Sequence, residues 1–218
     1  MAKKDRSGYR KKRSQTKPFR NPELGYYLIV TDTEGTERCY FEGLHANLPE
    51  KLKDKLVIKV IETKTVDLIN KSLELIAYEP QYRVPWIVFD RDQVKDFDEI
   101  IQSAKSRNIG VGWSNPCFEI WMYAYFGNMP AIHESWTCCS KFGDMYKKKT
   151  GQEYSKTDSQ MYKRLITYGD EEKAFKIAES KKVQCKNAGY SLPSEMCPCT
   201  NVDELVSEIV RRKKLYET

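Results

Sequence analysis

The chain has no long hydrophobic run, which argues against a membrane-spanning helix. No stretch approaches the roughly 18 consecutive apolar residues that such a helix needs. The basic N-terminus is not followed by an apolar segment of about 7–15 residues, so it does not resemble a secretory signal. With 40% hydrophobic and 31% charged residues, the composition is typical of a water-soluble globular protein. We therefore expect a cytoplasmic protein with no membrane association.

The cysteines lack the spacing of a structural zinc site. Cys138 and Cys139 are adjacent, and one residue separates Cys197 from Cys199. Structural zinc sites usually place about two to four residues between paired ligands. The total of seven cysteines is odd, which does not suit a disulfide framework. We expect reduced thiols, no disulfide and no zinc. A nucleophilic Cys117 paired with His133 is a weaker alternative, because the sequence around them has no recognisable catalytic signature.

The positive charge is concentrated at the N-terminus. The first 20 residues have one acid, Asp5, and nine basic side chains: Lys3, Lys4, Arg6, Arg10, Lys11, Lys12, Arg13, Lys17 and Arg20. This segment therefore carries a net charge of +8, and since the whole chain carries +6, the other residues total −2. A basic arm on a nearly neutral body is suited to binding nucleic-acid phosphates through counter-ion release. A solvated leader without a ligand is the alternative.

Short apolar segments alternate with amphipathic ones in the first half of the chain. The pattern predicts strands at residues 26–30, 56–62, 84–89 and 109–113, and helices at 40–48, 66–78, 97–106 and 117–126. This β-α-β-α order favours an α/β fold with a parallel sheet and helices on both faces. Three further amphipathic helices are predicted at residues 161–168, 171–181 and 202–216.

These patterns divide the chain into three parts. We expect a basic arm at residues 1–20, an α/β core at 21–130, and a mostly helical region at 131–218 that packs on the core. The helical region could also form a lid or a surface for a partner protein. Ligands of open parallel sheets bind beyond the carboxyl ends of the strands, so functional residues are expected there.

Acidic residues follow two of the predicted strands. Asp90 and Asp92 come directly after the strand at 84–89, and side chains two apart on an extended backbone point the same way. Carboxylates at a strand end suit Mg²⁺ or Mn²⁺, which also bind phosphates. The alternative is a solvated turn, where Asp is common because its side chain bonds to nearby backbone.

The first strand also leads into acids, namely Asp32, Glu34 and Glu37. If the carboxyl ends of the two strands share one edge of the sheet, an acid from this loop completes the cluster. Phosphoryl chemistry needs such an arrangement, because a metal held by carboxylates lowers the pKa of a water and offsets charge on the leaving oxygen.

Several segments carry a family resemblance. The strand that ends in an acid and the later hydrophobic strand with Asp-x-Asp resemble the Toprim domain of topoisomerases, primases and several nucleases. More closely, "YLIVTDTEGTERCYFEGL", "PWIVFDRD", "SNPCFEIWMYAYF" and "CPCTNVDELV" are similar to segments of the RloB-like family. The first strand of that family normally ends in Glu-Gly, whereas here Asp32-Thr33 occupies the matching position and Glu34-Gly35 follows. Either Asp32 or Glu34 is therefore the expected first-strand ligand.

The resemblance implies a Toprim-like fold and a Mg²⁺- or Mn²⁺-dependent nuclease of anti-phage defence. It carries Glu119 into the candidate site, with a structural role, pairing with Arg or capping buried backbone, as the alternative. It also implies an ATPase partner. The chain lacks the GxxxxGK[ST] motif that cradles nucleotide phosphates, so any ATP hydrolysis would have to come from such a partner. The competing interpretation is a non-catalytic Toprim-like module that binds nucleic acid or a partner.

Overall fold

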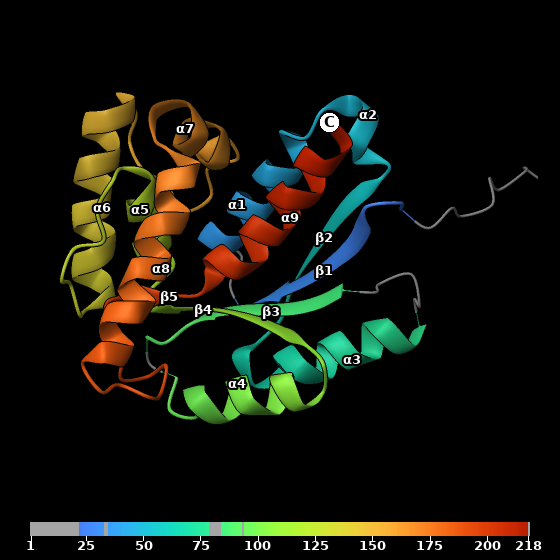
Figure 1. Ribbon diagram of the computed structural model, residues 1–218, viewed down its shortest axis with the longest axis horizontal. Coiled ribbons are helices and arrows are strands. Elements are labelled where there is room, and N and C mark those ends of the chain that lie inside the picture. Colours follow the sequence, from blue (N-terminus) through green and yellow to red (C-terminus); the bar gives the residue numbers. More distant parts are fainter. Residues whose placement is uncertain (1–21, 33–34, 79–83, 93, 218) are drawn as a thin grey trace, which may run out of the picture.

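A mostly parallel sheet forms the centre of the protein (Figure 1). The computed structural model describes residues 22–32, 35–78, 84–92 and 94–217. Within these residues the sheet has the order β2-β1-β3-β4-β5. Its strands are β1 (Gly25–Thr31), β2 (Leu56–Glu62), β3 (Val84–Asp90), β4 (Gly110–Asn115) and β5 (Cys199–Thr200). The first four are parallel to one another, and the short β5 is antiparallel to β4.

The central strands are buried on both faces. In β1 the side chains of Tyr27 and Ile29 join one hydrophobic cluster, while Leu28 and Val30 join the other. All four are fully buried. Strands covered on both sides lose the alternation of apolar and polar residues, which explains the continuous apolar runs in the sequence.

Helices cover both faces of the sheet, as the sequence predicts. In Figure 1, α3 (Leu68–Tyr78) and α4 (Phe97–Ser106) lie on one face, and α1 (Thr36–Ala46) and α9 (Val202–Glu217) lie on the other. Two short elements, α2 (Glu50–Lys53) and the 3₁₀ helix η1 (Thr65–Asp67), flank β2. Among the described helices, none combines the length and the apolar character needed to cross a bilayer.

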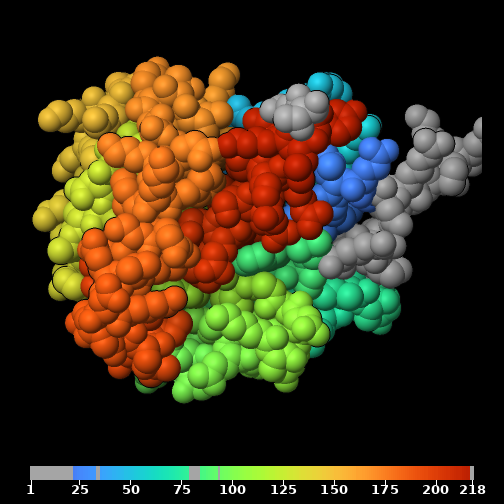
Figure 2. All heavy atoms as spheres, viewed as in Figure 1, coloured from blue at the N-terminus to red at the C-terminus, as the bar shows by residue number. Residues whose placement is uncertain are grey.

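The remaining helices gather beside β4 and β5. They are α5 (Glu119–Tyr125), α6 (Ser135–Thr150), α7 (Met161–Tyr168) and α8 (Glu171–Asn187). The helix α8 packs on α5 and α9, and α7 packs on α1. The space-filling view shows α9, in red, lying against α8, in orange (Figure 2). At its other end α9 is tied to the first strand, because Arg212 donates a hydrogen bond to the carbonyl oxygen of Leu24 at 3.0 Å.

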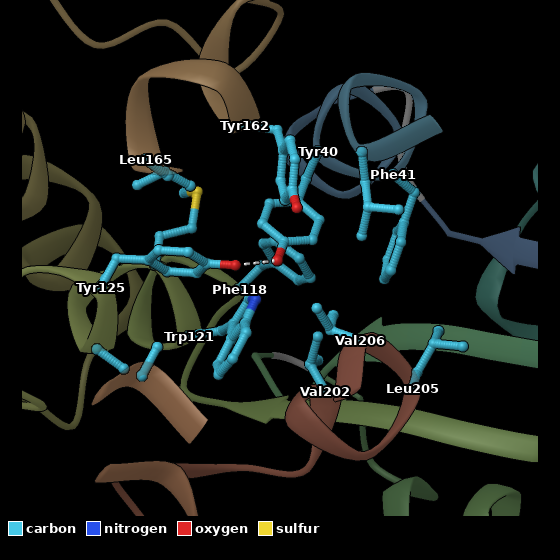
Figure 3. Packing of buried hydrophobic residues seen from close by; sticks show 14 of the residues in the cluster. Tyr40, Phe41, Phe118, Trp121, Tyr125, Tyr162, Leu165, Val202, Leu205 and Val206 are labelled. Carbon is cyan, nitrogen blue, oxygen red and sulfur yellow. Dashed lines mark hydrogen bonds between the residues drawn. The ribbon is translucent and has the colours of Figure 1, made fainter. Parts of the chain in front are cut away.

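A cluster of aromatic residues joins this helical group to the sheet domain (Figure 3). The hydroxyls of Tyr40 in α1 and Tyr125 in α5 are 2.6 Å apart. Glu171 of α8 accepts hydrogen bonds from Tyr125 and from Tyr162 of α7, each at 3.0 Å. Phe118, which precedes α5, packs edge to face against Tyr40. Buried polar groups in such a network need all of their partners, so the cluster fixes α5 relative to α1.

Among the described elements, the short α2 and η1 were not predicted individually, and neither were two elements near the site, α6 and β5. The helix α6 was not predicted, although Phe142 and Tyr146 have helical spacing and Gly151 ends the helix in a left-handed conformation. The strand β5 was missed because two residues are too few to give a pattern. It is held by Asn201, whose side chain accepts from Trp113 N at 2.7 Å and donates to Val111 O at 3.0 Å.

Candidate metal site at the strand ends

Five carboxylates line one cavity beyond the carboxyl ends of β1 and β3. The cavity has a volume of about 590 Å³, and its acidic residues are Asp32, Glu37, Asp90, Asp92 and Glu119. Since β1 and β3 are parallel neighbours in the sheet, their carboxyl ends meet at one edge, as expected from the sequence. This is the position at which open parallel sheets bind their ligands.

Asp32 lies directly after β1 and is only partly satisfied by hydrogen bonds. Its Oδ2 accepts from Thr65 of η1 at 3.1 Å. Its Oδ1 is buried and has no hydrogen-bond partner among the described residues. Burial raises the pKa of Asp32 to about 6, and the nearby charge of Asp92 adds to the rise, although the bond from Thr65 opposes it. The site therefore disfavours the ionised form of Asp32 when no cation is bound.

Asp90 is the last residue of β3 and shows the same deficit more strongly. Its Oδ1 is buried and finds no hydrogen-bond partner in the described part of the chain. Burial raises the pKa of Asp90 well above its usual value, and the charges of Glu37, Glu119 and Asp32 raise it further. The side-chain oxygens of a turn-forming Asp would accept hydrogen bonds from nearby backbone N–H groups. A buried carboxylate oxygen left open among other acids is better suited to a cation.

Asp92 reaches the cavity by a different route from the one that its spacing suggested. The strand ends at Asp90, and Asp92 lies in an exposed turn closed by a hydrogen bond from Val94 N to the carbonyl of Arg91. The backbone N–H of Asp92 donates to Pro116 O at 3.2 Å, and Ser135 donates to its Oδ1 at 3.1 Å. Contacts with the loop after β4 and with α6 therefore orient this carboxylate, rather than an extended backbone.

Glu37 and Glu119 form the buried wall of the site, with 3% and 1% of their surface exposed. Glu119 Oε1 accepts from Tyr154 at 2.6 Å and lies 3.6 Å from Lys156 Nζ. Burial alone would raise the pKa of Glu119, but the charge of Lys156 and the hydrogen bonds from Tyr154, Cys117 and the backbone together outweigh burial and lower the pKa. Glu119 is thus ionised and paired, with Lys rather than Arg as its partner.

Sequence reasoning missed the residues that hold these acids in place. Thr65, Ser135, Tyr154 and Lys156 come from three different segments, and each contacts one of the acids. Among the described residues that line the cavity, Lys156 is the only cation. It lies in the loop between α6 and α7, where no periodic pattern or motif marked it.

Ser114 and Asn115, which begin the family segment that also contains Glu119, support the sheet rather than the cavity. Ser114 Oγ is 3.2 Å from Thr200 Oγ1, and Thr200 also donates to Trp113 O at 2.8 Å. Asn115 donates to the carbonyl oxygens of Pro193 and Ser194. These bonds attach the segment before α9 to the end of β4. Glu119 begins α5, a few residues after this strand ends.

Two of the predicted sets lie outside the described residues. Glu34 follows Asp32 in the loop after β1, and the basic side chains of residues 1–20 precede the described chain. Between the two candidate first-strand ligands, the structure thus gives a position for Asp32 alone.

The seven cysteines are all described, and all are free thiols, as predicted. Two of them, Cys117 and Cys139, line the acidic cavity with Glu119, and these three residues could hold a metal ion. His133 lines a neighbouring cavity that does not include Cys117. The described residues thus give no support to a Cys117–His133 catalytic pair.

Comparison with known proteins identifies the family. The model of the RloB-like protein family matches residues 27–209, which include most of β1, the other four strands and the five acids that line the cavity. The search of curated proteins gave no match, and neither did the search of solved structures. The chain belongs to the RloB-like protein family.

Proposed function

We propose that this protein is a metal-dependent nuclease that hydrolyses phosphodiester bonds of nucleic acid at the acidic cavity. The observation that carries the proposal is the convergence of five carboxylates, two of which, Asp32 and Asp90, have a buried oxygen without a partner among the described residues. A cluster of this kind is unfavourable without a cation. Its all-oxygen donors suit Mg²⁺ or Mn²⁺.

The residues at the strand ends fit such an ion. Asp32, Asp90 and Asp92 would hold it, and Glu37 and Glu119 would add negative charge around it. When bound, Mg²⁺ would lower the pKa of a water molecule and offset the charge on the leaving oxygen of a phosphodiester. Thr65 and Ser135 keep Asp32 and Asp92 oriented by hydrogen bonds, so little reorganisation is needed when substrate arrives.

Lys156 gives the cavity a positive group for the substrate. Its side chain is 58% exposed, although its Nζ approaches the buried Glu119. Burial lowers the pKa of Lys156, but the neighbouring acidic groups, of which Glu119 has the largest effect, together outweigh burial and raise the pKa, so the ammonium keeps its proton. Lys156 can therefore contact a phosphate oxygen from the solvent side while Glu119 holds it at the cavity. An ammonium at this position stabilises charge that develops on a phosphoryl group.

The biological setting follows from the family resemblance. We propose that the protein is the effector of an anti-phage defence system and acts with an ATPase partner, which would restrain or direct cleavage. The +8 charge of residues 1–20 supports an electrostatic contact with the nucleic-acid backbone outside the cavity. This contact would bring DNA or RNA to the site without reading its sequence.

Cleavage assays test the proposal directly. Labelled DNA, tRNA and bulk RNA are incubated with purified protein in Mg²⁺, Mn²⁺ or EDTA, with and without the proposed ATPase partner. We expect cleavage of at least one substrate that depends on the metal. Binding of nucleic acid or of the ATPase without any turnover, across all of these conditions, would favour the non-catalytic module instead.

A further inference from the structure

A second set of ligand atoms lies on the wall of the acidic cavity and includes sulfur. Cys117 Sγ, Cys139 Sγ and a carboxylate oxygen of Glu119 all lie within 4.8 Å of one another. The two sulfur atoms are 3.9 Å apart. In a tetrahedral zinc site with Zn–S bonds of about 2.3 Å, the sulfurs are separated by about 3.8 Å. The thiols are thus already at the separation that zinc requires.

The fold brings these residues together from two elements. Cys117 and Glu119 stand on either side of Phe118, which is fixed in the aromatic core at the start of α5. Cys139 belongs to α6, where its neighbour Cys138 is fully buried in the hydrophobic core and Cys139 itself is half-buried at the cavity. Both positions are therefore anchored by packing. The separation of 22 residues between the cysteines explains why local spacing did not predict the site.

We propose that the protein binds zinc through Cys117, Cys139 and Glu119, with a fourth position open to the cavity. Thiolate ligands select zinc over magnesium, whereas the oxygen ligands at Asp32 and Asp90 select magnesium or manganese. Three protein ligands and an open position are typical of zinc sites that interact with a substrate or water, while structural sites have four protein ligands. The cavity thus has a soft and a hard metal position side by side, which reverses the expectation of no zinc.

Cobalt is a suitable probe because Co²⁺ in a tetrahedral thiolate site absorbs visible light. The full-length protein is stripped of metal under reducing conditions and titrated with Co²⁺, and Zn²⁺ is then added as a competitor. We expect one Co²⁺ per chain with sulfur-to-cobalt charge-transfer absorption, and its loss when one equivalent of Zn²⁺ displaces it. Excess Mg²⁺ should leave the absorption unchanged, since it does not compete for thiolates.

Variants assign the signal to these residues. Cys139→Ser and Cys117→Ser should each weaken Co²⁺ binding at least about 100-fold, because even changes outside the ligand set typically cost 10- to 100-fold. Cys39→Ser, which alters another half-buried cysteine, is the matched control and should bind as wild type. The Asp90→Asn, Asp92→Asn double variant should also keep the signal, which separates this site from the proposed magnesium site.

Two results would overturn the zinc site. One is wild-type protein that shows no charge-transfer absorption at any Co²⁺ concentration. The other is an undiminished signal in Cys139→Ser, which would place the metal on other cysteines. If Cys117→Ser fails to fold because Cys117 is buried, Cys139→Ser still decides the question, since Cys139 is half-buried.

Discussion

Asp32 follows β1 and Asp90 ends the adjacent parallel strand β3, and both line the same cavity. Each has a buried Oδ1 without a hydrogen-bond partner among the described residues. The charge of Asp32 raises the pKa of Asp90, after the larger effects of burial and of Glu37 and Glu119. Two such carboxylates destabilise the folded chain when both are ionised. The simplest explanation of their geometry is a bound cation that both Oδ1 atoms contact.

Removing one of these charges should therefore stabilise the metal-free protein. We expect Asp90→Asn to raise the free energy of unfolding in EDTA by on the order of 1–2 kcal/mol, because it relieves repulsion and keeps a similar side-chain volume. Urea denaturation followed by circular dichroism measures the change. Asp54→Asn, at an exposed position, is the control and should change little. A loss of stability in Asp90→Asn would mean that the carboxylate is a structural element of the turn.

The stability of the metal-free protein should also depend on pH through Asp32. Its pKa is about 6 in the folded chain, above the usual value of 3.8, so the folded state binds a proton that the unfolded state lacks between these values. Stability should then rise as pH falls from 7 through 6, and Asp32 should account for at most about 3 kcal/mol. Denaturation in EDTA at pH 5, 6 and 7 tests this. The rise should be smaller in Asp32→Asn, and an identical pH profile in both proteins would contradict it.

Much of the fold could be predicted from the sequence, because strands buried on both faces have continuous apolar runs. The predicted strand at residues 56–62 and helices at 97–106 and 161–168 coincide with β2, α4 and α7. The acids at the strand ends were also predictable, since β1 and β3 both lead into Asp. Their meeting in one cavity depends on the strand order, which places β3 next to β1.

The rest of the site depends on contacts between distant segments. Tyr154 and Lys156 reach Glu119 from a loop 35 and 37 positions away, and such a loop has no periodicity that could reveal its partner. Cys139 meets Cys117 only because α6 packs beside α5. A spacing rule applied along the sequence cannot detect either arrangement, because tertiary packing brings the groups together.

Lys156 provides a test of the positive group in the cavity. We expect Lys156→Gln to lower the cleavage rate about 100-fold, the typical effect of removing one group that stabilises transition-state charge. Lys156→Arg should recover part of the rate because the charge is kept. Lys149→Gln removes an exposed lysine in the last turn of α6 and should cleave as wild type. Because Glu119 loses its partner in Lys156→Gln, rates must be compared at equal folded fractions. An unchanged rate would exclude Lys156 from the reaction.

The basic arm should supply much of the non-specific affinity for nucleic acid. Deletion of residues 1–20 should weaken binding to all sequences and flatten the dependence on salt, since each neutralised phosphate contributes a slope of about −0.9 on duplex DNA. Fluorescence anisotropy between about 50 and 200 mM salt measures both effects. If the slope stays the same after deletion, the arm does not bind phosphates.

The most direct test of the proposed nuclease combines metal binding and turnover in one variant. Asp90→Asn, Asp92→Asn should fold and, without metal, melt at or above the wild-type temperature. It should bind Mn²⁺ much more weakly in a titration followed by electron paramagnetic resonance, and lose metal-dependent cleavage by orders of magnitude. Both substitutions keep side-chain size and remove the charge that the ion requires. Full metal-dependent cleavage by the double variant, on the substrate that the wild-type protein cleaves, would contradict the assignment of these acids as the catalytic metal site.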